Sequence, residues 1–146
     1  MRLAIGSDHA GLELKAELVS HLRTSGHEVT DLGTHDKSSI DYPDYAEKVA
    51  RAVVDGDSEL GFLVCGSGQG MCMAANKIQG VRAAVCSDTF SAHAVREHNN
   101  ANVLCLGQRV IGPGLAQEIV DAFLQAEFEG GRHARRVGKI MELEGR

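Results

Sequence analysis

Long apolar runs, positive charge and aromatic side chains are all scarce in this sequence. The 146 residues carry a formal net charge of -5, and aromatic residues account for 4% of them. Nucleic acids and anionic membranes attract positively charged surfaces, and single strands also stack on aromatic rings, so we expect neither nucleic acid nor membrane as a partner. No apolar run approaches the roughly 20 residues that span a bilayer, and the quickly polar start is unlike a signal peptide. The sequence therefore predicts a cytoplasmic protein.

Spacings typical of metal sites and redox motifs are absent as well. The cysteines at positions 65, 72, 86 and 105 form no Cys-x-x-Cys pair, and the seven histidines form no His-Glu-x-x-His. Zinc sites and redox motifs depend on such spacings. We expect unpaired thiols, no bound metal and no cofactor.

What the sequence does contain is an alternation of short Val-, Ile- and Leu-rich runs with longer stretches of helical period. This pattern is typical of strand–helix units around a buried parallel sheet. With 43% hydrophobic residues, a chain of this length can bury its own core. We predict one domain over residues 1–146 with an α/β fold: a three-layer α/β/α sandwich around a Rossmann-like, five-stranded parallel sheet. The expected strands cover residues 3–7, 28–32, 60–65, 81–86 and 103–106.

The expected helices lie between and after these strands. Leu14, Leu18 and Leu22 repeat on one helical face, and Asp44 is placed to cap the helix that follows Pro43. The last helix has no strand after it and is free to pack against another surface. The helices are expected at about residues 11–25, 44–54, 71–77, 87–98, 115–128 and 131–143.

Two of the loops that follow strands have an unusual composition. In doubly wound sheets the ligand crevice forms at the carboxyl ends of neighbouring strands, commonly the first and the third. Here these strands end in Ser7-Asp8-His9-Ala10-Gly11 and in Cys65-Gly66-Ser67-Gly68-Gln69-Gly70. Glycines at alternate positions let backbone amides converge on an anionic oxygen. The second loop lacks the Gly-Lys-Ser/Thr of a P-loop, and no Gly-x-Gly-x-x-Gly opens the first strand–helix turn as a dinucleotide site requires.

Cys65 is the candidate base. An arbitrary cysteine at the end of a strand is most often a small buried hydrophobe. Beside a helix N-terminus, however, the thiolate form is favoured, and a thiolate can accept a proton. Cys72, Cys86 and Cys105 lie within a helix or strands, where we expect them to be core residues.

Further polar groups follow near the end of the chain. His98 and Asn99 can simply cap the fourth helix, but we also expect His98 at the same rim as the glycine loop, where it could exchange a proton with a ligand oxygen. Arg132 and Arg136 lie one turn apart on the last helix, and Arg109 follows the fifth strand. Such cations usually form a solvated face, yet two guanidiniums on one face also make a phosphate clamp.

Taken in order, these segments resemble the type B ribose-5-phosphate isomerase family, which includes galactose-6-phosphate and allose-6-phosphate isomerases. The resemblance covers nearly the whole chain. The residues that carry it are Ser7-Asp8-His9-Ala10-Gly11, Asp41-Tyr42-Pro43, Cys65-Gly66-Ser67-Gly68-Gln69-Gly70, Ala74-Ala75-Asn76-Lys77, His98-Asn99-Asn100-Ala101-Asn102 and Gly107-Gln108-Arg109.

The resemblance implies that ribose 5-phosphate and ribulose 5-phosphate, sugar phosphates of the pentose phosphate pathway, interconvert through an enediolate without a metal. Cys65 would move the proton between C2 and C1, and the backbone of Gly66, Gly68 and Gly70 would hold the charge that develops on oxygen. Ser67, where the family more often has threonine, would relay the proton between O1 and O2. Some relatives carry a glutamate after the glycine loop, but this chain has Gln69 and Met71 there, so Cys65 has no evident substitute.

The remaining roles are implied in the same way. His98 with Asp8 would open the furanose ring, and Tyr42 and Asn99 would line the sugar. The phosphate would be received by His9, Arg109, Arg132 and Arg136. The resemblance also implies a homodimer or a dimer of dimers, in which sites are completed across the interface and the last helix finds its docking surface.

Two alternatives stay open. A galactose-6-phosphate or allose-6-phosphate isomerase would differ in the length of sugar that the pocket admits, although a complete residue set in one chain favours a self-sufficient homo-oligomer acting on a pentose. A non-enzymatic flavodoxin-like binding module is compatible with the fold alone. A receiver domain would need clustered acidic residues after the first strand, and a flavin would colour the protein yellow.

Overall fold

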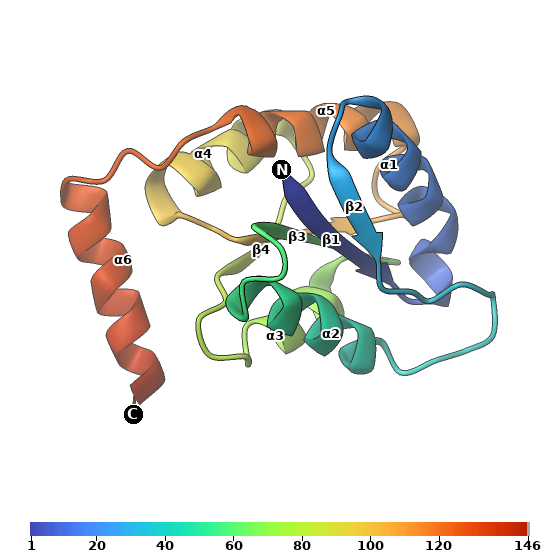
Figure 1. Cartoon of the computed structure of the whole chain (residues 1–146), viewed down its shortest axis with the longest axis horizontal. Coiled ribbons are helices and arrows are strands. Elements are labelled where there is room, and N and C mark those ends of the chain that lie inside the picture. The colour runs from blue at the N-terminus through green and yellow to red at the C-terminus, as the bar shows by residue number, and fades with distance from the viewer. Residues whose placement is uncertain (146) are drawn as a thin grey trace.

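The computed structural model describes residues 1–145, and its five strands form one parallel sheet in the order β2-β1-β3-β5-β4 (Figure 1). The strands are β1 (Arg2–Ser7), β2 (Glu28–Asp31), β3 (Leu60–Cys65), β4 (Ala83–Val85) and β5 (Val103–Gly107). The α-helices are α1 (Leu12–Thr24), α2 (Tyr42–Val54), α3 (Gln69–Ala75), α4 (Thr89–Asn99), α5 (Pro113–Gln125) and α6 (Arg132–Glu142). Short 3-10 helices, η1 (His9–Gly11) and η2 (Leu143–Gly145), precede α1 and follow α6.

Helices cover both faces of the sheet, so the predicted three-layer α/β/α architecture is confirmed (Figure 1). Successive strand residues point to opposite faces. Phe62 and Val64 therefore pack in one core with α1, α4 and α5, whereas Leu63 and Cys65 pack in the other with α2 and α3. All six residues of β3 are buried, which explains why its sequence is apolar without alternation. The same alternation directs Cys65 toward α3.

Some predicted boundaries are wrong for identifiable reasons. The cap expected at Asp44 is instead at Asp41, because proline is tolerated in a first helical turn and α2 begins before Pro43 rather than after it. The fourth strand begins only at Ala83, since the backbone N–H of Arg82 donates to the side-chain oxygen of Asn102 at 2.8 Å. Helix α3 starts two residues earlier than expected, directly after Gly68.

Helix α6 stands apart from the sheet, beyond the edge that carries β4 (Figure 1). Its contacts are mainly with α4 and with η2. Val137 is its one buried residue, while Ile140 and Leu143 after it are 47% and 57% exposed. Among residues 1–145 no helix has the length and apolarity that crossing a membrane would require.

Candidate active site

A cavity of about 500 Å³ opens at the carboxyl ends of β1 and β3. These strands are neighbours in the sheet, and the helices that follow them, α1 and α3, belong to opposite layers. The cavity therefore lies at the switch point where such sheets bind ligands. Its lining consists of Asp8, His9, Ala10, Tyr42, Cys65, Gly66, Ser67, Gly70, Arg109 and Val110.

Cys65 is the last residue of β3 and is 6% exposed. The backbone N–H of Gly68 donates to its sulfur at 3.0 Å. The sulfur thus lies at the cavity wall with a backbone hydrogen-bond donor beside it.

The glycine loop depends on glycine at two positions in particular. Gly68 has a φ of 81°, in the left-handed region that favours glycine, and this turn aims its amide at Cys65. A Cβ on Gly70 would lie 2.6 Å from the Tyr42 ring, so only glycine lets that ring approach the loop. Ser67 is exposed, and its hydroxyl oxygen accepts a hydrogen bond from the backbone N–H of Gln69 at 3.2 Å.

The first-strand loop and the loop after β5 close the cavity from two sides. Asp8 is 8% exposed, and its Oδ1 accepts the backbone N–H groups of Ala10 and Gly11 at 2.9 and 3.0 Å. His9 is exposed, and the backbone N–H of Ile40 donates to its Nδ1 at 3.5 Å. On the other side, the backbone N–H of Arg109 donates to the carbonyl of Gly66 at 3.0 Å, which ties the two loops together.

His98 and Asn99 lie at the opposite edge of the sheet, so the prediction that His98 shares a rim with the glycine loop is wrong for a single chain. A helix that returns from the carboxyl edge of a parallel sheet must end at the amino edge, and α4 ends at Asn99 just before β5 begins. The backbone N–H of Gly61, near the start of β3, donates to the carbonyl of Asn102 at 3.0 Å, whereas Cys65 ends the same strand. A strand of that length spans roughly 17 Å.

His98 instead belongs to a cluster at the N-terminal end of α6. Its ring stacks on His133, with centroids 4.4 Å apart and planes 12° from parallel. Glu129 Oε1 lies 3.7 Å from His98 Nε2 and 3.4 Å from His133 Nε2. Two imidazoles and a carboxylate could hold a metal, and their ligand atoms lie within 4.8 Å of one another. Parallel rings, however, aim their lone pairs side by side rather than at one point, an arrangement that fits a shared carboxylate better than a tetrahedral metal.

Arg132 and Arg136 lie with this second group. Both are exposed on α6, which begins at Arg132 beside the stacked histidines. Asn99 lines a separate cavity of about 520 Å³ between β4, α4 and the C-terminal helices. One chain therefore carries the expected residues as two separate groups, one at the carboxyl ends of the strands and one at their amino ends.

The sequence predictions were wrong for one residue and assigned no individual role to two others. Hydrogen bonding with the Cys105 side chain lowers the pKa of Cys72 to about 7, so this half-buried thiol is not the inert core residue that we expected. Gln108 joins the loop after β5 to α1, because its Oε1 accepts the backbone N–H of Leu14 at 2.9 Å. Lys15 is a buried lysine on α1, and no sequence motif singled it out.

Comparison with known proteins finds relatives that match nearly the whole chain. A family model described as "Ribose/Galactose Isomerase" matches residues 3–140. Ribose-5-phosphate isomerase B of Escherichia coli is 50% identical over 145 residues, which cover 99% of this chain and 97% of that protein. D-erythrulose-4-phosphate isomerase of Pectobacterium atrosepticum is 49% identical over 142 residues, 96% of this chain and 93% of that protein. The structure of ribose-5-phosphate isomerase B from Clostridium thermocellum superimposes with a TM-score of 0.98 at 54% identity, covering 99% of this chain and 98% of that one.

Proposed function

The chain belongs to the ribose/galactose isomerase family, and we propose that it interconverts ribose 5-phosphate and ribulose 5-phosphate with Cys65 as the base. The observation that carries the assignment is the Cys65 sulfur at the cavity wall, 3.0 Å from the Gly68 amide nitrogen. A thiolate held in this way supplies a base and hydrogen-bond donors at one place, as proton transfer next to a carbonyl requires.

The proposed chemistry moves one proton between neighbouring carbons. The Cys65 thiolate removes the proton from C2 of the open-chain aldose, and the C–H electron pair forms the C1–C2 double bond of an enediolate as the carbonyl oxygen O1 becomes negative. Amides of the loop from Gly66 to Gly70 stabilise that charge. Ser67 steadies the proton that passes from O2 to O1, and the Cys65 thiol returns its proton to C1 to give the ketose.

The phosphate and the closed ring need residues that one chain does not bring together. His9 and Arg109 line the Cys65 cavity, and we assign them to the phosphate, with Tyr42 on the sugar and Asp8 acting with His98 in ring opening. We assign ring opening to His98, a sugar contact to Asn99, and further phosphate contacts to Arg132 and Arg136, all from a second copy of the chain. The separation of the two groups across the sheet and the exposed position of α6 support a homodimer, or a dimer of such dimers.

The length of the sugar is the open part of the assignment. A relative at 49% identity is named for a four-carbon sugar phosphate, and the family description includes galactose isomerases. We favour ribose 5-phosphate because the protein of that name is 50% identical over nearly the whole of both chains. We also place the reaction in the cytoplasm, since all four cysteines are free thiols, as is usual in a reducing compartment.

The test is a comparison of kcat/KM on ribose 5-phosphate, D-erythrulose 4-phosphate, allose 6-phosphate and galactose 6-phosphate, each with and without EDTA. We expect ribose 5-phosphate to have the highest value and EDTA to leave it unchanged. Run in D₂O, the reaction should also place deuterium in the product at the carbon that Cys65 reprotonates. A higher value for another sugar would replace the substrate assignment, and loss of activity with EDTA would contradict a metal-free mechanism.

A further inference from the structure

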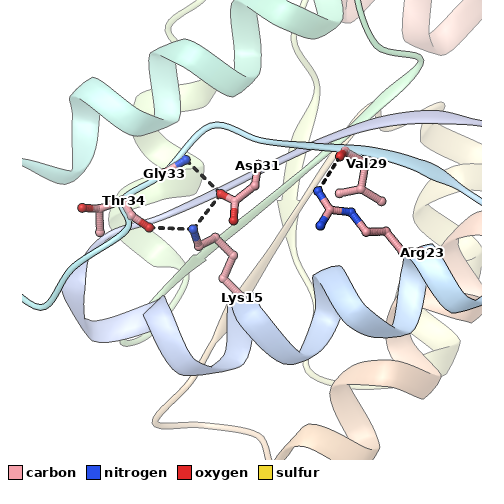
Figure 2. Close-up of polar contacts among 6 residues, drawn as sticks. All are labelled: Lys15, Arg23, Val29, Asp31, Gly33 and Thr34. Atoms are coloured by element: carbon pink, nitrogen blue, oxygen red, sulfur yellow. Dashed lines mark hydrogen bonds and ion pairs between the residues drawn. The ribbon is translucent and has the colours of Figure 1, made fainter.

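Lys15 carries a buried ammonium near the Cys65 cavity. The proposed mechanism does not use this group. Its side chain on α1 is 2% exposed, and its Nζ donates to Asp31 Oδ1 and to the backbone carbonyl of Thr34, both at 2.6 Å (Figure 2). Removing an ammonium from water is costly, and a buried ion pair often contributes no more stability than well-packed apolar residues would. Stability alone therefore does not account for a lysine at this position.

Its two contacts hold the beginning of the loop that joins β2 to α2, residues 32–41. Asp31 ends β2, and its Oδ1 also accepts the backbone N–H of Gly33 at 3.0 Å (Figure 2). The next backbone groups pair with the last residue of β1: the N–H of Ser7 donates to the carbonyl of Gly33 at 2.7 Å, and the N–H of Thr34 donates to the carbonyl of Ser7 at 2.8 Å. Lys15 thus fixes the loop where it meets the strand that leads to Asp8.

The far end of the same loop contacts or leads to two residues that line the cavity. The backbone N–H of Ile40 donates to His9 Nδ1 at 3.5 Å. Asp41 is the N-cap of α2, whose first residue is Tyr42. The loop has no helix or strand of its own, so its path depends on the contacts at its two ends and on an exposed ion pair between Lys37 and Glu13 of α1 at 3.5 Å. Cys65 ends β3 and lies outside this network, whereas the glycine loop meets it where the Tyr42 ring approaches Gly70.

We propose that Lys15 is a positioning residue for substrate binding, which holds the loop 32–41 and through it places His9 and Tyr42 without touching the substrate. Because His9 and Tyr42 bind substrate only under the proposed function, the role of Lys15 rests on that function too. Loss of the ammonium weakens the grip on the sugar phosphate and leaves the proton transfer at Cys65 nearly intact. The effect therefore falls on KM rather than on kcat.

The first experiment measures KM and kcat for Lys15→Met, which keeps the length and apolar packing of the side chain. We expect KM to rise roughly tenfold and kcat to change by less than about threefold. Arg23→Met is the matched control, because Arg23 also joins α1 to β2, donating from Nη2 to the carbonyl of Val29 at 3.0 Å, but does not reach the loop (Figure 2). Its KM should stay at the wild-type value, and an equal rise in both variants would contradict a specific role for Lys15.

A second pair of measurements separates positioning from stability. The double variant Lys15→Met/Asp31→Asn removes both charges, so its melting temperature should recover relative to the single variant while its KM stays high. A wild-type KM in the double variant overturns the proposal, and this variant decides the matter if Lys15→Met alone does not fold. Amide hydrogen exchange of residues 32–41 should be faster in both variants than in Arg23→Met, and unchanged exchange overturns the proposal as well. Lack of ribose 5-phosphate turnover by the wild type would instead refute the proposed function, and the exchange rates would still decide whether Lys15 holds the loop.

Discussion

The position of the Cys65 sulfur is set by the end of β3 and by the turn that follows it. Every residue of β3 is buried, so the sulfur is held at a fixed point between the sheet and the first residues of α3. The Gly68 amide reaches it only because the backbone at Gly68 turns through a left-handed conformation. A rigid strand and a glycine turn together keep the sulfur beside a hydrogen-bond donor before any substrate arrives, as the proposed role of Cys65 requires.

The first prediction concerns Cys65 itself. In Cys65→Ala the base is lost, and we expect kcat to fall by ~10²–10⁴ while the protein still binds ribose 5-phosphate. Exchange of the C2 proton with D₂O, followed by NMR, should stop, whereas the melting temperature should stay near that of the wild type. Ser67→Ala serves as the matched control, because it removes a hydroxyl from the same cavity and leaves the base. Undiminished proton exchange in Cys65→Ala would remove the assignment of the base.

The second prediction uses two glycines of the same loop as a pair. A Cβ on Gly70 would lie 2.6 Å from the Tyr42 ring, but a Cβ on Gly66 would meet the nearest Arg109 atom at an ordinary 3.5 Å. We expect Gly70→Ala to displace Tyr42 and raise KM by roughly tenfold, in line with the usual cost of overpacking, and Gly66→Ala to change KM much less. Steady-state kinetics on both variants checks this, and similar KM values for the two would contradict the placement of Tyr42.

Individual residues were predictable where a sequence motif contained them. They were not predictable where their properties depend on which other parts of the chain bury them. The sequence placed Cys65, its glycines and Asp8 near one another because they follow strands that end at the same edge of a parallel sheet. Lys15 gave no signal, since a lysine next to Leu14 in an amphipathic helix looks like any solvated cation until the loop that covers it is known. Cys72 was misjudged for a similar reason, because its pKa depends on Cys105 in β5, far along the chain.

At the scale of elements, the direction of each helix decides which residues can share a site. The periodicity of the sequence located α4 correctly to within two residues. Periodicity alone did not place His98 correctly. Its position follows once α4 is treated as the helix that returns the chain to the amino ends of the strands. The cap at Asp41 was also missed, because proline is tolerated in the first turn of α2. The late start of β4 at Ala83 was missed because it depends on the hydrogen bond from the Arg82 backbone to the Asn102 side chain.

The third prediction tests how α4, which carries His98, is anchored at its start. Asp88 Oδ1 accepts the backbone N–H of Ser91 at 2.7 Å, and this hydrogen bond lowers the pKa of Asp88 below its ordinary value of 3.8. Because the folded pKa lies below the unfolded one, the stabilisation is fully present above pH 3.8 and is lost as the pH falls through the lower value. Asp88→Ala should therefore lower the melting temperature by a few degrees at neutral pH, and the difference should shrink on acidification below pH 3.8.

Asp88→Asn is the control for that experiment. Asparagine keeps an acceptor for the Ser91 amide but has no titratable proton, so most of the neutral-pH stability should remain without its acid dependence. Thermal melts followed by circular dichroism at several pH values give all three curves. A difference between Asp88→Ala and the wild type that stays constant down to strongly acidic pH would contradict the capping role.

At the scale of the whole molecule, one chain carries two incomplete groups of the expected residues. Asp8, His9, Tyr42 and Arg109 line the Cys65 cavity. His98, His133 and Glu129 lie together at the N-terminal end of α6. The edges that separate them are roughly a strand length apart, too far for one sugar phosphate to touch both. A second copy related by a two-fold axis would bring each group to the other and give two equivalent sites, and this geometry is what links the proposed activity to the proposed dimer.

The fourth prediction follows from that two-fold arrangement and is a complementation experiment. Cys65→Ala and His98→Ala, each nearly inactive on the ring-closed substrate, are unfolded together and refolded as a mixture. If each site takes Cys65 from one chain and His98 from the other, a mixed dimer has one site with both defects and one intact site. Random pairing of equal amounts makes half of the dimers mixed, and each mixed dimer has one intact site of two, so the mixture should regain about a quarter of the wild-type activity. Cys65→Ala mixed with Ser67→Ala is the control, because those residues belong to the same group and no mixed dimer then has an intact site. Activity in the first mixture no higher than that of the separate variants would mean that Cys65 and His98 do not act across an interface.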